Sequence, residues 1–321
     1  MKPGARWMKG LALLLTIGIL IAIYARIDRR LLIYYFTQLH PGYFALALII
    51  FIPQILVSSF RWQTMTRQIC PMGLGQSMQQ VMAAKALNAL VPSKLGEMSK
   101  AYFLRMSSGK NVEQTVPAVI LEKVLDMGGL CAVLMVGVLI APQRNEPVWL
   151  GGAIAGGCLA AVVLLLLVPL RSLGERLMRR NGRLKWLGQL LLGWDNLIQE
   201  WKRRGRTLSR IVALSVLLWG LHLLQIYLFF PSLNHSVPLT PALTLIPLAI
   251  LVGLLPITIG GMGTRDSALI VLFAPYANSA LMAGVGLLCS MRYWVDTLLG
   301  VPFLHWYTRR MGEGAGGRGK R

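Results

Sequence analysis

Residues 148–170 read VWLGGAIAGGCLAAVVLLLLVPL and contain no charged side chain. A hydrocarbon core of about 30 Å takes roughly 20 helical residues to cross, so this run is long enough to span a membrane. Strands of a membrane β-barrel would be shorter and would alternate apolar with polar residues, which this run does not do. The stretch predicts a membrane-spanning helix and an all-α fold.

The rest of the chain has the same apolar character. Its 321 residues are 55% hydrophobic and only 14% charged, and its mean hydropathy is +0.59. This composition leaves too little polar surface to coat a soluble globule, so the sequence predicts a polytopic helical membrane protein. The expected full spans lie near residues 9–25, 42–60, 114–140, 148–170, 208–230 and 279–307.

Shorter apolar runs lie between these spans, and most of them are too short to cross a membrane alone. They are found near residues 77–91, 98–106, 241–255 and 264–274. The runs pair around two breaks rich in Pro and Gly, at Pro92–Glu97 and Pro256–Asp266. Two re-entrant helical hairpins would have this pattern.

The distribution of charge predicts how the chain lies in the membrane. The net charge of +21 comes from Lys and Arg residues between apolar runs and at the chain ends, which indicates orientation and attraction to anionic lipid rather than binding of nucleic acid. Residues 171–210 are rich in Arg and Lys, so this segment should be cytoplasmic. Both termini then fall in the cytoplasm, and the hairpins at 77–106 and 241–274 enter from opposite faces. The 26–41 connection is an exception, because it is expected outside and yet carries three arginines.

The N-terminal segment imitates a signal peptide. Basic residues precede the apolar run at 10–25. Residues 22–25 make a poor cleavage site and many spans follow, which favours a retained first helix.

The two breaks resemble each other. Residues 90–98 read LVPSKLGEM and residues 254–262 read LLPITIGGM, so both contain Leu-x-Pro-x3-Gly-x-Met. Each break has a short apolar arm on either side, and hairpins entering from opposite faces are typical of inverted-repeat transporters. We expect one membrane domain over 1–310, with halves at about 9–140 and 148–307. A cytoplasmic Gly/Arg tail follows at 311–321.

Pro and Gly at the breaks interrupt helical hydrogen bonding, and backbone groups freed in this way persist at membrane depth only where they face protein, water or a polar ligand. The candidate break residues are Pro92, Gly96, Pro256, Gly260, Gly261 and Gly263.

Charged residues inside the apolar runs are the other candidates. A charge exposed to lipid costs at least about 2.5–3.5 kcal/mol on insertion scales, so such residues usually face the protein interior. Those in or close to the runs are Arg61, Lys94, Glu97, Lys100, Glu122, Lys123, Asp126, Arg265, Asp266, Arg292 and Asp296. A polar chamber between the repeats would meet phosphate with Arg or Lys, and an amine or hydroxyl with Glu or Asp.

A structural alternative stays open for these charges. Glu122 with Lys123 and Asp126, and Arg292 with Asp296, would be pairs that hold helices together, since residues four apart on a helix share a face.

No motif for a cofactor, a metal or a nucleotide is visible. The glycines at 260–263 are not a phosphate-binding loop, because no strand precedes them and no Lys-Ser/Thr follows. The His and Cys residues have no metal-ligand spacing, and no GxSxG nucleophile motif occurs. We therefore expect no cofactor, no metal site and no enzyme activity.

Several motifs in order resemble a known family. They are Arg61-Trp62, Asn88 with PSKLGE at 92–97, Glu122 with Asp126, GGMGTRD at 260–266, and Arg292. Together they resemble the flippase-like membrane domain of lysylphosphatidylglycerol synthases and its stand-alone relatives, over about residues 9–307. The sequence departs from the pattern at Lys94, Lys123, Ile259 and Asp266, where Arg, Arg, Pro and Glu are common. All but Ile259 keep the charge.

The resemblance implies movement of lipids across the cytoplasmic membrane of a prokaryote, with phospholipids or lipid-linked sugars as substrates. The residues implied in headgroup binding are Arg61, Asn88, Lys94, Glu97, Glu122, Asp126, Arg265, Asp266, Arg292 and Asp296. The soluble aminoacyl transferase domain of the fused synthases has no counterpart here. Membrane lipids are the expected partners, with a separate synthase or glycosyltransferase and a homo-oligomer as further possibilities. The alternatives are a membrane-embedded lipid-directed transferase and an accessory subunit of a glycosyltransferase.

Overall fold

The computed structural model describes residues 3–90, 96–141, 146–179, 184–255, 258 and 261–316. Every regular element in these ranges is a helix, so the expected all-α membrane fold is confirmed. Of the predicted break residues, Pro92, Pro256 and Gly260 lie outside the described residues, and so does the candidate Lys94.

Within the described residues, four helical segments are long and apolar enough to cross a membrane. The first, Pro41–Thr66, consists of α3 (Pro41–Ile49) and α4 (Phe51–Thr66), which meet at Ile50. Pro53 explains this discontinuity, because it has no N–H to donate to the carbonyl of Ile49. The other three are α7 (Val112–Ile140), α8 (Glu146–Leu167) and α11 (Thr207–Ser232). These segments match the expected spans at 42–60, 114–140, 148–170 and 208–230.

The other two expected spans lie in α1 (Pro3–Arg26) and α14 (Ser279–Gly316). The described side chains of α1 form only a short apolar stretch from Leu13 to Arg26. Helix α14 has 38 residues, more than expected, and its apolar part is interrupted by Arg292 and Asp296. Within the described side chains, neither helix contains a stretch that is both long enough and apolar enough to cross a membrane. That α1 and α14 cross the membrane therefore stays a prediction.

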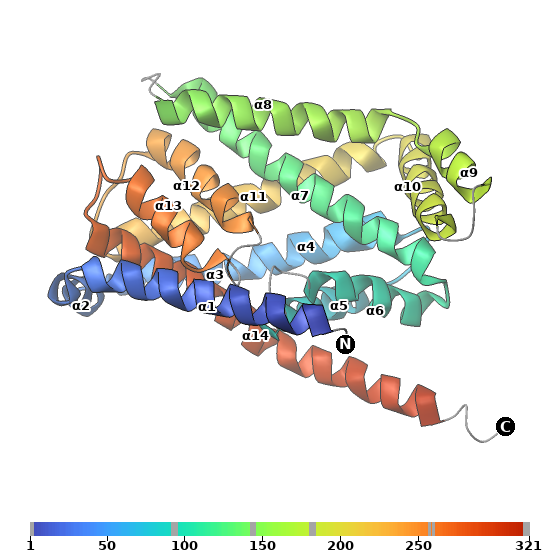
Figure 1. Cartoon of the computed structure of the whole chain (residues 1–321), viewed down its shortest axis with the longest axis horizontal. Helices are drawn as coiled ribbons and strands as arrows, with labels where there is room; N and C mark the ends of the chain where they lie inside the picture. The colour runs from blue at the N-terminus through green and yellow to red at the C-terminus, as the bar shows by residue number, and fades with distance from the viewer. Residues whose placement is uncertain are drawn as a thin grey trace.

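The four short apolar runs on either side of the two breaks are helical, so each break lies between two helices. Helix α5 (Leu74–Leu90) precedes α6 (Ser99–Ser108), and α12 (Leu239–Leu254) precedes α13 (Thr264–Leu272). In Figure 1 the helices α5 and α6 lie in the right-hand half of the molecule and the helices α12 and α13 in the left-hand half. The two pairs therefore occupy opposite halves of the protein. That they are re-entrant in a bilayer stays a prediction.

Three further helices occupy segments expected to connect spans. Helix α2 (Arg29–Thr37) lies in the 26–41 connection, where the Asp28 carboxylate caps it by accepting the N–H groups of Arg30 and Leu31 at 2.9 and 3.2 Å. Helices α9 (Arg171–Arg179) and α10 (Lys185–Arg203) form in the basic 171–210 segment. Figure 1 shows α9 and α10 at the right-hand end and α2 at the left-hand end.

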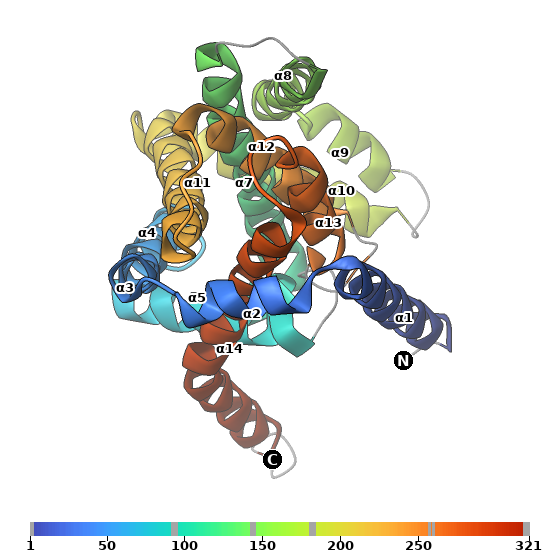
Figure 2. The same cartoon turned by 90° about the vertical axis from the view of Figure 1, so that its left-hand side faces the viewer.

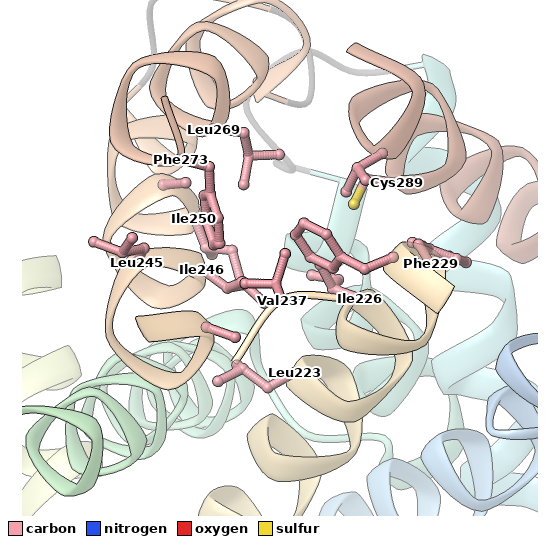
Figure 3. Packing of buried hydrophobic residues seen from close by; sticks show 14 of the residues in the cluster. Leu223, Ile226, Phe229, Val237, Leu245, Ile246, Ile250, Leu269, Phe273 and Cys289 are labelled. Carbon is pink, nitrogen blue, oxygen red and sulfur yellow. The ribbon is translucent and has the colours of Figure 1, made fainter. Parts of the chain in front are cut away.

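The largest cluster of buried apolar side chains draws mainly on α7 and α11–α14, whereas α1 and α8 lie towards the rim of the bundle (Figure 2). In Figure 3 Leu223, Ile226 and Phe229 of α11 lie close to Ile246 and Ile250 of α12. Each of these side chains is at least 90% buried. Fully burying such a side chain contributes about 1.5–3 kcal/mol, so this cluster fixes the second hairpin against α11.

Helix α5 packs along α14, and one glycine permits this close approach. A Cβ at Gly300 would collide with the carbonyl oxygen of Met82 and lie 2.9 Å from the Cβ of Ala86. We expect Gly300→Ala to destabilise the purified protein by about 1–3 kcal/mol, because overpacking forces helices apart. The melting temperature of each purified variant measures this effect. The control is Gly220→Ala in α11, where an added Cβ would meet nothing within 4 Å. Equal melting temperatures for the two variants would contradict the close packing of α5 on α14.

Candidate functional site

A cavity of about 460 Å³ lies between the two helix pairs. It is lined by residues of α4–α7 and α11–α14, together with residues next to the break of each pair. Of the residues expected to bind a headgroup, those that line it are Arg61, Asn88, Glu97, Glu122, Asp126, Arg265, Arg292 and Asp296. Asp266 lies behind Arg265 rather than on the cavity wall.

Asn88 ties the turn of the first pair together. Its side-chain oxygen accepts the N–H of Glu97 at 3.1 Å, and its amide nitrogen donates to Glu97 Oε1 at 3.3 Å. Gly96 packs against the same residue, since a Cβ at position 96 would collide with the backbone nitrogen of Asn88. A side chain at position 96 would push the end of α5 away from Glu97.

Glycines serve the turn of the second pair in the same manner. Gly261 and Gly263 have φ angles of +77° and +92°, a region that favours glycine. A Cβ on Gly261 would lie 2.5 Å from the carbonyl oxygen of Gly253. The Asp266 carboxylate then accepts the N–H of Gly263 at 3.1 Å and caps α13. Gly261 lines the cavity, whereas Gly96 and Gly263 do not.

Arg61 is the centre of a buried ion network on the first half of the cavity. Its guanidinium donates to Glu122 at 3.0 Å and to Asp126 at 2.6 Å, and also to the hydroxyl of Ser215 at 3.0 Å. The side chains of Arg61 and Glu122 are each only 1% exposed. Charges this deep persist only when they are paired and hydrogen-bonded, so Arg61 joins α4 to α7 and α11.

Two lysines complete the network. Lys100 donates to both carboxylate oxygens of Glu122, at 2.8 and 2.9 Å, and lies 3.9 Å from Glu97. Lys123 pairs with Glu97 and lies 2.9 Å from Asp126. Each carboxylate of this half therefore contacts two basic side chains, and the turn of the first pair is held to α7 through Glu97.

Arg265 and Asp266 form the main ion pair of the second half, with Arg265 Nη2 2.6 Å from Asp266 Oδ1. The same nitrogen donates to the carbonyl oxygen of Gly286 and to the hydroxyl of Ser290, each at 3.0 Å. These contacts hold the start of α13 against α14. The Nη1 atom of Arg265 is buried and has no hydrogen-bond partner among the described residues.

Arg292 and Asp296 do not pair with each other, so that part of the structural alternative is wrong. Asp296 pairs with Lys85 at 2.7 Å, which links α14 to α5. Arg292 instead faces α11, with its Nη1 3.2 Å from Gln225 Oε1 and 3.4 Å from His222 Nδ1. Because α5 packs along α14, Asp296 pairs with Lys85 rather than with Arg292, which lies one turn earlier on its own helix. The alternative is also wrong for Glu122, which pairs with Arg61 and Lys100 rather than Lys123, but it is confirmed for Lys123 and Asp126, which pair at 2.9 Å.

Arg292 is distinct among the cations that line the cavity. Arg61, Lys85, Lys100 and Lys123 each have a carboxylate partner on the wall, and Arg265 has Asp266 behind it. Arg292 has no carboxylate partner among the described residues. Its guanidinium lies 5.5 Å from the ring centre of Tyr293, and that of Arg265 lies 5.9 Å from the same ring. The second half of the cavity therefore has positive charge available for an anion.

Sequence reasoning did not select Lys85, His222 or Tyr293, all of which line the cavity. Lys85 had a detectable signal, because it interrupts the apolar run at 77–91 and lies three residues before Asn88 on the same helical face. His222 and Tyr293 had no such signal, since single histidine and tyrosine residues in an apolar span do not by themselves indicate a site.

Comparisons with known proteins agree with this architecture. The family model of the lysylphosphatidylglycerol synthase TM region matches residues 10–300. A UPF0104 membrane protein of Methanothermobacter thermautotrophicus is 22% identical over 298 residues, which cover 85% of this chain and 88% of that protein. One of Pyrococcus horikoshii is 25% identical over 283 residues, or 79% of this chain and 84% of that protein.

These relatives are membrane proteins, and the structure has several helices that can span a membrane. The protein is therefore a multi-pass membrane protein. Because the family model covers most of its length, the chain belongs to the family of the lysylphosphatidylglycerol synthase TM region.

Proposed function

We propose that this protein moves a lipid with a polar, anionic headgroup from one leaflet of a prokaryotic cytoplasmic membrane to the other. The headgroup would pass through the central cavity while the acyl chains stay in the surrounding lipid. Phospholipids and lipid-linked sugars are the two classes of lipid that carry such a headgroup. The proposal is for transport, with a separate synthase or glycosyltransferase as the source of the lipid.

The observation that carries the proposal is a charged cavity built from both helix pairs, with Arg292 left without a carboxylate partner among the described residues. A phosphate would find the guanidinium of Arg292 on one wall. An amine or hydroxyl of the same headgroup would find Glu97 and Asp126 on the opposite half. The two halves thus offer complementary groups to the two ends of a headgroup.

The arrangement of the two pairs supports movement rather than static binding. The two pairs lie in opposite halves of the molecule (Figure 1), and residues at the described ends of both pairs, such as Glu97 and Gly261, line the same cavity. A headgroup held between their turns would be released to either face by rocking of one pair against the other, as inverted-repeat transporters do. No nucleotide-binding motif occurs in the sequence, so we expect the movement to be passive or driven by an ion gradient.

Vesicles containing the full-length protein test the proposal. They carry phosphatidylglycerol labelled on an acyl chain, and a membrane-impermeant reductant bleaches only the outer leaflet. We expect wild-type vesicles to lose the inner-leaflet signal steadily and protein-free vesicles to keep it. Equal retention in the two preparations would contradict lipid movement.

One variant tests the first turn in the same vesicles. Glu97→Gln removes the charge that holds Lys123, so we expect the initial rate to fall by roughly tenfold, the effect of losing one charge-assisted contact. Glu175→Gln on α9 is the matched control, because Glu175 is 48% exposed and its only ion-pair partner among the described residues is the exposed Arg171. A Glu97→Gln rate equal to that of the control would remove Glu97 from the transport path.

A further inference from the structure

A second cavity, of about 490 Å³, lies away from the central one, where α4 ends, α10 ends and α11 begins. Arg67, Arg204 and Arg210 line it, and no acidic residue does. We call it the arginine pocket. Its charge balance differs from that of the central cavity, where basic residues other than Arg292 are matched by carboxylates.

Two of the three arginines are available for a ligand. Arg67 and Arg210 are exposed, and neither has an ion pair with another of the described residues. Arg204 is partly neutralised by Glu200, which lies 2.7 Å from its Nε. The pocket therefore keeps a clear positive charge.

The start of α11 adds uncapped backbone donors to the same place. The first backbone bond at this end runs from the N–H of Arg210 to the carbonyl of Arg206, and no side chain caps the helix. Thr207, the first residue of α11, lines the pocket. The free N–H groups of a first helical turn attract anions, both by hydrogen bonding and through the helix dipole.

Gln68 gives an independent sign of an absent polar partner. It lines the pocket, and both its amide nitrogen and its amide oxygen are buried without a hydrogen bond to any described residue. Buried polar groups in folded proteins are nearly always satisfied. Because these two amide atoms lie beneath the pocket wall, the direct contacts to a ligand would come from the arginines and from the start of α11.

We propose that the arginine pocket binds a phosphate-bearing anion, which is either the headgroup of an anionic phospholipid or a free phosphate ion. The pocket combines arginine side chains with the N–H groups of a helix start, and both prefer phosphate oxygens. Phe60 and Met72 supply an apolar side next to the charges, on which the glycerol end of a lipid would lie. The proposal does not depend on transport through the central cavity.

Binding to the purified full-length protein in neutral detergent tests it. The probes are dioleoyl phosphatidic acid, compared with dioleoyl phosphatidylcholine, and sodium phosphate, compared with sodium chloride at equal ionic strength. Ligand that binds only the folded state raises the melting temperature, so the rise against concentration gives the affinity. We expect the wild type to bind phosphatidic acid or phosphate more tightly than the matched comparison compound.

Paired variants locate the site. Arg67→Gln/Arg210→Gln should weaken binding by about tenfold or more, because two charge-assisted contacts are lost. Arg176→Gln/Arg179→Gln on α9 removes the same charge outside the pocket and should change affinity by no more than about twofold, as exposed charges usually do. Arg67→Lys/Arg210→Lys keeps the charge and should give an intermediate loss, since lysine lacks the planar fork.

A loss confined to phosphatidic acid identifies a lipid headgroup, and a loss for both probes identifies the phosphate group itself; either result supports the pocket. Equal affinities of the wild type and the Arg67→Gln/Arg210→Gln variant would overturn the proposal. An equal loss in the α9 control would do so too, because it would show attraction to diffuse charge. Since Arg67 and Arg210 are exposed, unchanged gel-filtration behaviour is expected for every variant.

Discussion

Replacing Arg61 by glutamine is expected to destabilise the protein by about 3–5 kcal/mol, the usual cost of removing one partner from a buried ion pair. Arg61 is 1% exposed and holds Glu122 and Asp126 at 3.0 and 2.6 Å. Glutamine would leave these carboxylates with less positive charge in a site of low dielectric constant. Asp126 would retain Lys123, and Glu122 would retain Lys100.

Unfolding of the purified protein in mixed micelles of increasing dodecyl sulfate content measures this effect. Arg176→Gln on α9 is the control, since Arg176 is exposed and should change stability little. Adding Asp126→Asn to Arg61→Gln should recover part of the loss, because it removes the carboxylate that lost its partner. An Arg61→Gln variant as stable as the control would show that the buried network does not hold α4 to α7.

Replacing Arg292 by glutamine is expected to slow movement of an anionic lipid by at least about tenfold, the effect of one lost charge-assisted contact, with little change in stability. Among the described residues Arg292 contacts the side chains of His222 and Gln225 and no carboxylate. Its removal therefore leaves no buried negative charge unpaired. We therefore expect the substitution to weaken headgroup binding and to leave the stability of the fold nearly unchanged.

The vesicle assay with labelled phosphatidylglycerol and labelled phosphatidylcholine measures this prediction. Arg292→Gln should slow the anionic lipid more than the zwitterionic one, and Arg292→Lys should keep part of the anionic rate because it keeps the charge. Equal rates for Arg292→Gln and the wild type would remove this residue from headgroup binding. An equal loss for both lipids would show a structural role instead.

Much of the fold could be predicted because a bilayer restricts what a chain can do. A charge-free run such as 148–170 can hardly be anything but a span, and it became α8. Intramembrane charges must face protein, which is why Arg61, Glu122 and Asp126 came together from separate helices. Each of these inferences follows from the cost of exposing a charge or an unpaired backbone group to lipid.

The pairing of charges could not be predicted in the same way. Spacing along one helix suggested Arg292 with Asp296, but α5 packs along α14 and brings Lys85 to Asp296. Likewise, Lys100 reaches Glu122 because α6 packs on α7. These contacts depend on how separate helices pack against each other, which periodicity within one helix does not describe. The helix α2 was missed for a different reason, because its nine residues show little burial pattern and are started by the single cap Asp28.

The central claim is that a lipid headgroup enters the cavity between the two helix pairs. Photo-crosslinking tests it most directly, with phosphatidylglycerol carrying a photoreactive group on its headgroup and with wild-type protein in vesicles. We expect adducts on peptides that line the cavity, including Tyr293 of α14 and Trp219 of α11, and we expect unlabelled phosphatidylglycerol to compete them away. Adducts confined to outward-facing side chains such as Val271 and Leu298, each 71% exposed, would contradict the account.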